Sequence, residues 1–526
     1  MLYRPEKGKL WDPTVLRWQG RFYLFTMYYA PGESESYACR LAVSEDGVHW
    51  EEWGNVLTDE RPVWKCGVFR AGDGRFYMNY GTMSGQGVND MMGYAVSDDL
   101  VHWEKTGYDA PDPRWYEPHE RWDHMYCRES GHGGYVGCIV AVPKAGESGL
   151  CGLRRSQDGR TWETCPPPPV DWCGYESARE MEVGGFERLG GRWYLMGGIC
   201  PPYNGNYGYA AYVFESDSED GPFRPCKKHR FAGQNGVPGE IFVSCLPGFV
   251  HDYDTAPSLG ASKDAAPGVS TDKDAAPGVS TGKDAAPGVS AGKDAAPGVS
   301  ADGFAPTPLL ASGAVCYPLD DPQNTCWTLP LCRVMQGADG LMPGWWEGND
   351  VLRGEPCACP ETLTLESRAL PAYQLTDEYA EAPLLSFDAS AGLFLEGWLA
   401  AEPWPERGAV RAGVWRPSAA GFALGGTAIL TEAGHPRCSY TRVGGWDGSR
   451  FDPLDTVSPW DAARAYLVPG ERTPFRLLVL HGVAQLYLDG RLCQTFVCAR
   501  RPKTLSAVVK NARVRLGGLR AYRMAL

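Results

Sequence analysis

The sequence lacks several features that would point to a membrane, a secretion pathway or nucleic acid. It has no run of about 18 apolar residues, the length that a membrane-spanning helix needs. Residues 1–7 contain no apolar segment of the kind that a signal peptide carries. Basic residues are not in excess, since the formal net charge is -14 and the pI is about 5.2. We therefore expect a cytoplasmic protein that binds neither nucleic acid nor a membrane.

Paired zinc-binding cysteines are missing as well. The 18 cysteines are scattered, and Cys357 and Cys359 form a lone C-x-C pair beside prolines. Without a secretion signal, these cysteines are expected to be reduced and mostly buried. His124 and His132 lack a carboxylate motif beside them, so we expect them to be structural. The sequence predicts no metal and no other cofactor.

The chain is long and rich in aromatic side chains. With 526 residues it is too long for one ordinary core, so two or more domains are expected. Aromatic residues make up 12% of the chain, including 19 Trp and 26 Tyr. Such a composition suits stacking on flat, partly apolar ligands, and it is equally typical of β-strands.

Two patterns recur through the first 225 residues or so. One is a turn followed by an aromatic strand, beginning at Gly20, Gly74, Gly134 and Gly191. The other is a polar Ser-x-Asp turn closed by an aromatic residue, in segments 44–50, 97–103, 156–162 and, in a degenerate copy, 216–223. The turn residues Trp50, Trp103 and Trp162 are 53 and 59 positions apart. This period, with several short strands per unit, is typical of propeller blades.

A fifth unit is indicated by segments 329–334 and 340–346. The sequence therefore predicts a five-bladed β-propeller over about residues 1–365. Four near-identical decapeptides of the type KDAAPGVSTD interrupt it at residues 263–302, with a decayed copy before them. Their Pro, Gly and small residues cannot support a core, so segment 254–305 is predicted to be a disordered surface insertion.

The pattern changes again from about residue 385. Segment 475–496 alternates apolar and polar residues around an Asp489-Gly490 hairpin turn. With segment 514–522 as a closing strand, it predicts a β-sandwich over residues 385–526. The expected fold class is all-β.

Three carboxylates precede the aromatic strands of three blades. They are Asp12 in a Trp-Asp-Pro segment, Asp123 in an Arg-Trp-Asp segment, and Glu182 in a Glu-Met-Glu segment. Equivalent places in successive blades meet at the central funnel, so we expect these side chains to lie together. Two carboxylates that flank a glycosidic bond suffice for its hydrolysis. A third can bind sugar hydroxyls or shift the pKa of a neighbour.

These motifs resemble glycoside hydrolase family 32, with family 43 as a five-bladed relative, over nearly the whole chain. The resemblance implies that Asp12 is the nucleophile, Asp123 the transition-state stabiliser and Glu182 the acid/base of a retaining furanosidase. It also implies that the substrate is an oligosaccharide or small glycoside of the β-fructofuranoside type. A family-43-like enzyme would instead be inverting, with Asp12 as base and Asp123 as pKa modulator.

The chain departs from the family 32 pattern at residues that shape the fructose site. No Asn precedes Asp12, one residue separates Arg121 from Asp123, and Cys-Pro does not follow Glu182. An arabinofuranoside or another furanoside is therefore an open alternative. A sialidase-like enzyme and a non-catalytic carbohydrate-binding protein are two further ones.

Several neighbouring residues are candidates for substrate binding. Trp11, Trp64 and Trp122 are candidates for sugar-stacking walls, although Trp64 and Trp122 would equally suit the core. Arg121 is a candidate partner of an active-site carboxylate or of a surface one. Glu180 shares a strand face with Glu182 and is a second candidate for the acid. The oligomeric state is not indicated by the sequence.

Overall fold

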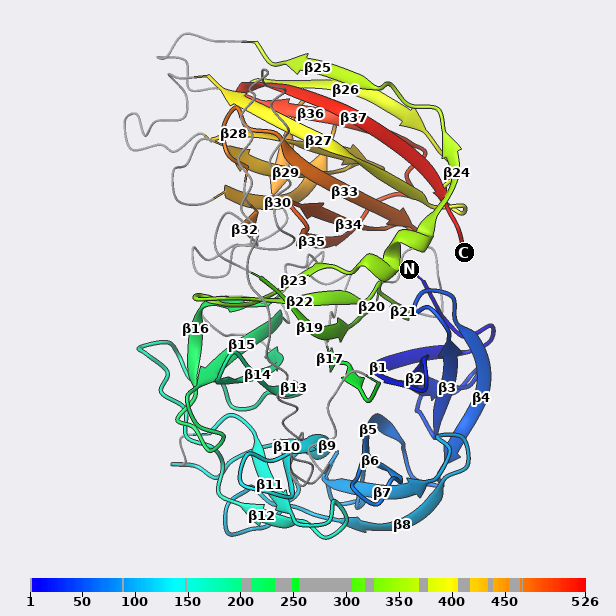
Figure 1. Ribbon diagram of the computed structural model, residues 1–526, viewed down its shortest axis with the longest axis vertical. Helices are drawn as coiled ribbons and strands as arrows, with labels where there is room; N and C mark the ends of the chain where they lie inside the picture. Colours follow the sequence, from blue (N-terminus) through cyan, green and yellow to red (C-terminus); the bar gives the residue numbers. More distant parts are fainter. Residues whose placement is uncertain are drawn as a thin grey trace, which may run out of the picture.

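The computed structural model describes residues 2–87, 89–146, 149–199, 210–231, 248–254, 305–316, 326–368, 377–404, 417–433, 439–453, 464–465 and 467–526. In these ranges the chain is built almost entirely of β-strands (Figure 1). The six-residue 3₁₀ helix η1 (Glu347–Leu352) is the one helix there, and no helix is long and apolar enough to cross a membrane. The decapeptide repeats at 263–302 lie outside the described residues.

Four four-stranded antiparallel blades form most of the first half of the chain. Blade one contains β1 (Lys9–Trp18), β2 (Arg21–Tyr29), β3 (Ala38–Ser44) and β4 (Glu51–Thr58). Blade two contains β5 (Trp64–Arg70), β6 (Phe76–Thr82), β7 (Met91–Ser97) and β8 (Glu104–Asp109). Blade three contains β9 (Trp122–Glu129), β10 (Tyr135–Ala141), β11 (Gly152–Ser156) and β12 (Glu163–Cys165). Blade four contains β13 (Glu182–Leu189), β14 (Arg192–Ile199), β15 (Ala210–Ser216) and β16 (Arg224–Arg230).

The fifth blade closes the ring. It contains β17 (Gly248–Phe249), β19 (Ala305–Ser312), β22 (Cys332–Gly337) and β23 (Gly340–Trp345), while β20 (Ala314–Cys316) pairs with β21 (Cys326–Thr328) beside it. The first strands of successive blades are neighbours, from β1 through β5, β9 and β13 to β17 and back to β1. The predicted five-bladed propeller is thereby confirmed, and Figure 1 shows its blades arranged around a centre.

The recurring Ser-x-Asp segments are turns that bind their own backbone. In blade one the Ser44 hydroxyl accepts from the amide of Gly47, and Asp46 accepts from the amides of Val48 and His49. The turns at 97–102 and 156–161 repeat this arrangement. Because the side chains satisfy the turn amides, each connection is fixed without help from another element.

A short segment, 248–254, fills the centre of the propeller. Its strand β17 pairs with β19, and β18 (His251–Asp252) pairs in parallel with β1. The His251 ring stacks on Tyr126 of blade three at 4.5 Å, and the Tyr253 hydroxyl accepts from the Arg70 amide of blade two at 2.8 Å. Phe249 lies against β13 of blade four. One segment therefore contacts all five blades.

Two further sheets form the predicted β-sandwich. One runs through β35 (Arg491–Val497), β34 (Val483–Leu488), β33 (Thr473–Leu480), β27 (Leu393–Pro403) and β37 (Ala512–Met524), to which β24 (Arg353–Cys357) and β25 (Thr362–Glu366) pair. The other contains β26 (Tyr379–Ser386), β36 (Thr504–Lys510), β28 (Ser418–Leu424), β29 (Thr427–Ala433), β30 (Ser439–Trp446), β31 (Phe451–Pro453) and β32 (Arg464–Ala465). Their facing apolar side chains form one buried cluster.

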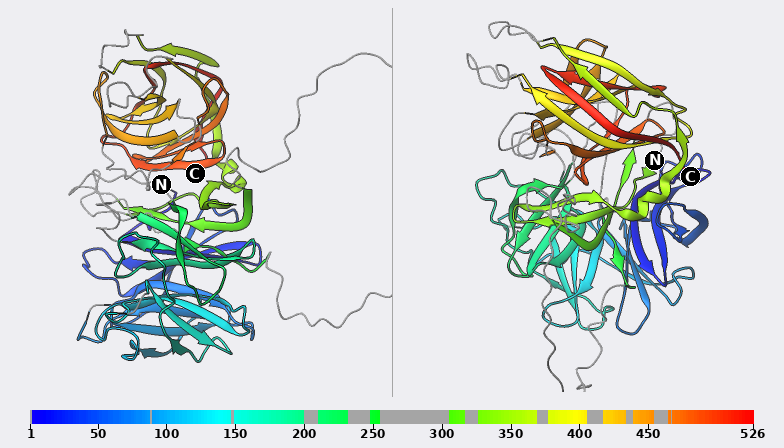
Figure 2. Two further views of the ribbon diagram at one scale, coloured as in Figure 1. Left: turned by 90° about the vertical axis from the view of Figure 1, so that its left-hand side faces the viewer. Right: turned by 45° about the horizontal axis from the view of Figure 1, so that its top comes forward.

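The propeller and the sandwich are joined more closely than two separate domains would be. Gly344 of β23 pairs with Arg491 of β35, so the fifth blade continues into one sandwich sheet. A shared apolar cluster around Trp345, Phe394 and Tyr487 lies at this junction. Strands β24 and β25 fall in the range predicted for the propeller, yet they pair with β37 of the sandwich. Both views of Figure 2 show the two parts stacked directly on each other.

Candidate active site

The inner strands of four blades are irregular at the same level of the funnel. Their pairing registers shift at Asp12-Pro13 in β1, at Lys65 in β5, at His124 in β9 and at Gly184 in β13. A β-bulge bends its strand and re-aims the neighbouring side chains, and bulges are common beside active sites. These four bulges surround one hollow.

That hollow, which we call the funnel pocket, has a volume of about 220 Å³. It is lined by Trp11, Asp12, Met27, Tyr29, Trp64, Lys65, Asn89, Arg121, Asp123, Val140 and Glu182. The three carboxylates predicted from three different blades therefore meet in one place. Of the predicted stacking residues, Trp11 and Trp64 line the pocket as expected.

Asp12 has an unusual backbone conformation. Its φ is +46°, in the left-handed region, although Pro13 follows it. Both the side chain and a following proline disfavour this conformation, which costs on the order of 1–3 kcal/mol. Strain of this kind persists where the surrounding structure imposes it, and here it directs the Asp12 carboxylate into the funnel pocket.

Arg121 connects the acids of blades three and four. Its guanidinium donates to Asp123 Oδ2 at 2.9–3.0 Å and to Glu182 Oε1 at 2.7 Å, whereas Glu180 Oε1 lies 3.7 Å away. Arg121 thus pairs with two of the three predicted carboxylates. Because it is shared, it holds Asp123 and Glu182 in fixed positions relative to each other.

Lys65 supplies the second positive charge of the pocket. It is 8% exposed, and its ammonium group donates to the Val183 carbonyl at 3.4 Å. Trp64-Lys65 opens blade two as Trp11-Asp12 and Trp122-Asp123 open blades one and three. The pattern of a tryptophan before a charged residue could have identified Lys65, which the sequence analysis missed.

Two acids of the funnel pocket, Asp12 and Asp123, have raised pKa values. Burial raises the pKa of Asp12 to about 7; Lys65 opposes this shift and Glu182 adds to it. Burial also raises the pKa of Asp123 to about 6, against the nearby Arg121 guanidinium. Carboxylates tuned toward neutral pH are typical of acid–base chemistry.

Asn89 is a second residue that the sequence analysis missed. Within the described residues its Oδ1 atom is buried without a hydrogen-bond partner, and the residue lines the funnel pocket. A buried polar atom of this kind costs free energy unless a ligand satisfies it. Asn89 is therefore a candidate acceptor for a sugar hydroxyl.

Trp122 does not lie in the funnel pocket, so its prediction as a stacking wall is wrong. Successive side chains of a strand point to opposite faces, and Asp123 faces the funnel. The Trp122 side chain is fully buried on the other side, packs on Tyr116 at 5.2 Å and donates to Asp109 Oδ1 at 2.9 Å. It is a core residue of blade three.

The two histidines near blade three have different surroundings. His124 is 2% exposed, and burial lowers its pKa well below the usual range. His132 pairs with Asp220 at the surface, at 3.3 Å. In the part of the chain that the structure describes, no three His, Cys, Asp or Glu side chains converge as metal ligands.

No protein-family model and no curated protein sequence matches this chain. Solved structures do match it along nearly its whole length. Sucrose-6-phosphate hydrolase from Lactobacillus gasseri is 14% identical with a TM-score of 0.62, covering 99% of this chain and 92% of its own. Exo-inulinase from Aspergillus awamori is 12% identical with a TM-score of 0.58, and the match covers 99% of this chain and 97% of the exo-inulinase chain.

A GH32 beta-fructofuranosidase from Bombyx mori is 13% identical, with a TM-score of 0.55, and covers 99% of this chain and 92% of its own. Identities this low establish a common fold. The resemblance predicted from the blade motifs is therefore confirmed for the fold. This chain has the propeller-and-sandwich architecture of these glycoside hydrolases.

Proposed function

We propose that this protein is a glycoside hydrolase that cleaves a furanoside of the β-fructofuranoside type. The observation that carries the proposal is the convergence of Asp12, Asp123 and Glu182, from three blades, in one pocket beside Arg121 and Lys65. The solved structures with the same fold include a beta-fructofuranosidase, an exo-inulinase and a sucrose-6-phosphate hydrolase, which supports the choice of substrate.

The proposed mechanism is retaining and has two steps. Asp12 attacks the anomeric carbon while Glu182 protonates the leaving oxygen, which breaks the glycosidic bond and forms a glycosyl-enzyme ester. Glu182 then takes a proton from water, which attacks the same carbon and releases Asp12. Asp123 and Asn89 bind ring hydroxyls, and Trp11 and Trp64 form the walls. Arg121 holds Asp123 and Glu182 in place.

One observation favours an inverting alternative. A pKa of about 7 for Asp12 suits a general base that activates water, as in a family-43-like mechanism. Asp123 would then adjust the pKa of its neighbours, and the substrate would be an arabinofuranoside or another furanoside. The two mechanisms differ in the anomer that they release.

The proposal is tested by hydrolysis of sucrose, short fructans and aryl furanosides, with the first-formed anomer read by NMR. Glu182→Gln should lower turnover about 10²–10⁴-fold, because the variant cannot transfer a proton. Glu180→Gln is the matched control, because Glu180 lies two residues before Glu182 and 3.7 Å from the Arg121 guanidinium but does not line the funnel pocket, and it should cost much less. No turnover of any furanoside by the wild type would contradict the proposal, and an inverted product would favour the alternative.

A cytoplasmic location stays a prediction. It is supported by the thiol form of the cysteines in the described ranges, where even Cys138 and Cys151, with sulfurs 3.3 Å apart, are not bonded.

A further inference from the structure

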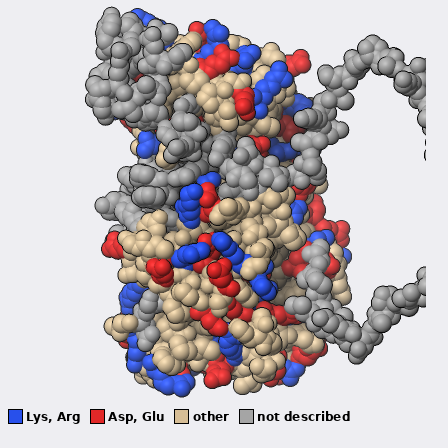
Figure 3. Space-filling model, turned by 60° about the vertical axis from the view of Figure 1, so that its left-hand side comes forward, with Lys and Arg blue, Asp and Glu red and all other residues tan. Residues whose placement is uncertain are grey.

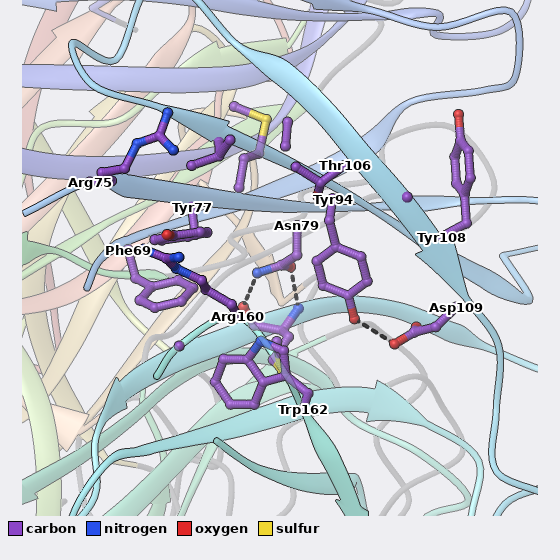
Figure 4. Close-up of a pocket in the computed structure, with 16 residues that line it drawn as sticks. Phe69, Arg75, Tyr77, Asn79, Tyr94, Thr106, Tyr108, Asp109, Arg160 and Trp162 are labelled. Atoms are coloured by element: carbon purple, nitrogen blue, oxygen red, sulfur yellow. Dashed lines mark hydrogen bonds between the residues drawn. The ribbon is translucent and has the colours of Figure 1, made fainter. Parts of the chain in front are cut away.

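A second cavity lies on the side of blade two that faces blade three. Its volume is about 470 Å³, larger than the funnel pocket, and the two share no residue. We call it the blade-two cavity. Its walls include Tyr77, Asn79 and Tyr94 from blade two, with Arg160 and Trp162 from blade three (Figure 4). Tyr108 also lines it, but its ring points away from the others and its hydroxyl donates to Asp59.

The register of the strands shows why blade two has this cavity. In each of the first four blades, the residue three positions before the serine of the polar turn pairs with a residue of the preceding strand. These equivalent pairs are Phe25–Leu41, Asn79–Tyr94, Cys138–Leu153 and Met196–Val213. Blade two alone among these four has polar groups at both positions. In blade one, Phe25 packs edge-on against Trp103 at 6.0 Å. Asn79 lacks that phenyl ring, and the space in front of Trp162 stays open.

The outer strand of blade two also carries a smaller side chain than the outer strand of blade one at an equivalent position. Three residues after the turn tryptophan, blade one has Trp53 and blade two has Thr106. Thr106 lines the blade-two cavity, and Tyr108 beside it is 39% exposed. Large side chains are therefore replaced by small or polar ones at equivalent positions on two strands, β6 and β8.

Asn79 itself is held by the neighbouring blade. Its side-chain amide donates to the Met125 carbonyl at 2.9 Å and accepts from the Met125 amide at 2.7 Å. The polar replacement thus has a structural partner, and the floor of the cavity is rigid. Met125 also lines the cavity, two residues after Asp123.

The charges around the blade-two cavity are paired within the protein. Arg75 binds Asp98 at 2.7 Å, Arg160 binds Asp73, and Asp109 accepts from Tyr94 and Arg154. No single charge is left to attract an ion of opposite sign among these groups. Aromatic faces beside paired polar groups instead suit a neutral ring that carries hydroxyl groups on its edges and C–H groups on its faces.

We propose that the blade-two cavity is a second carbohydrate-binding site, separate from the funnel pocket. Its aromatic walls stack on a sugar ring, and the Tyr94 hydroxyl and the Asp109 carboxylate, which also line it, meet the sugar hydroxyls. Its volume suits one or two sugar units. The choice of carbohydrate as the ligand class rests on the proposed function, whereas the existence of the cavity does not.

The test is calorimetric titration of the full chain carrying Glu182→Gln, which slows turnover, with fructans of three to five units and, in parallel, maltotriose. Two classes of binding site are expected for at least one probe. Adding Trp162→Ala should weaken one class about tenfold or more and leave the other unchanged. Trp53→Ala, an exposed tryptophan of the neighbouring blade, is the matched control.

Thr106→Trp is the second variant, because it fills the blade-two cavity without removing core packing and restores the residue type that blade one has. A single class of sites that neither variant alters, or two classes that neither variant alters, would overturn the inference. Binding that depends on Trp162, in a protein that hydrolyses no furanoside, would leave the inference standing and refute only the proposed function. Hydrolysis of a furanoside without binding that depends on Trp162 would support the proposed function and refute the inference.

Discussion

The funnel pocket and the blade-two cavity are built from the same repeat but differ in how their charges are arranged. In the funnel pocket, the cations Arg121 and Lys65 lie among several acids, and Arg121 contacts both Asp123 and Glu182. Around the blade-two cavity, Arg75 and Arg160 each have a carboxylate partner of their own. Burial raises the pKa values of Asp12 and Asp123 in the funnel pocket, whereas the paired charges around the blade-two cavity leave a surface without net charge.

The positions of the two sites explain this difference. The funnel pocket lies where inner strands bulge and carry charged residues toward the axis. The blade-two cavity lies on the side of a blade, where Asn79 and Thr106 take the places of larger residues. Acidic and basic side chains are interspersed over the propeller face that Figure 3 shows. A propeller can thus hold a reactive site and a binding site that share no residues.

The largest effect should come from Asp12→Asn. Without its nucleophile or base, the enzyme should lose about 10³-fold or more of its turnover. The same change should stabilise the fold at alkaline pH. Because the folded-state pKa of Asp12 is about 7, above its ordinary value of about 3.9, the stability that its protonated form contributes is lost as pH rises through 7.

Melting curves of Asp12→Asn and the wild type at pH 5 and pH 8 would check this prediction. The variant should melt higher than the wild type at pH 8, and the difference should shrink at pH 5. A variant that is less stable at pH 8 would show that Asp12 is better solvated than its surroundings indicate.

A smaller effect is expected from Asn79→Leu, which gives blade two the apolar character of its neighbours. The change removes both hydrogen bonds to the Met125 backbone and leaves buried polar groups unsatisfied. We expect a loss of about 1–3 kcal/mol in the free energy of unfolding, measured with denaturant. Met196→Leu, at the equivalent position of blade four, is the control and should cost less than about 1.5 kcal/mol. Equal losses in the two variants would argue against a special role for Asn79.

The smallest effect should come from Lys65→Met, and it should depend on pH. Lys65 favours the ionised form of Asp12, so its removal should raise the pKa of Asp12 further above about 7. If kcat/KM requires ionised Asp12, its acidic limb should move upward by about one pH unit. Activity at pH 6 would then fall by up to about tenfold, with little change above pH 8. Lys105→Met, which removes a partly exposed ammonium group paired with Asp59 in blade two, should leave the pH profile unchanged.

Much of the propeller could be predicted because its signals are local. Each Ser-x-Asp turn binds its own amides, so the turns at Ser44, Ser97 and Ser156 are visible without knowledge of any contact. The acids Asp12, Asp123 and Glu182 were found because they recur at one place in a repeat. Lys65 occupies the same place in blade two, but a lysine there does not fit the pattern of acids from which the site is predicted.

Other features depended on the packing of distant segments. Trp122 lies beside two pocket residues in the sequence, but strand alternation points it into the core of blade three. The link between Gly344 and Arg491, which joins the fifth blade to the sandwich, has no signal in either segment alone. The blade-two cavity required the register of four blades to be known.

The sequence by itself determined the all-β class, the blade period and the residues that carry charge into the funnel. These depend on turn chemistry and on alternation within single strands, which act over a few residues. Only the tertiary structure decided which faces those residues take, how Arg121 is shared between blades and where space remains between them. Bulges, pairing registers and the fit of facing side chains settle these questions, and all three are properties of segments in contact.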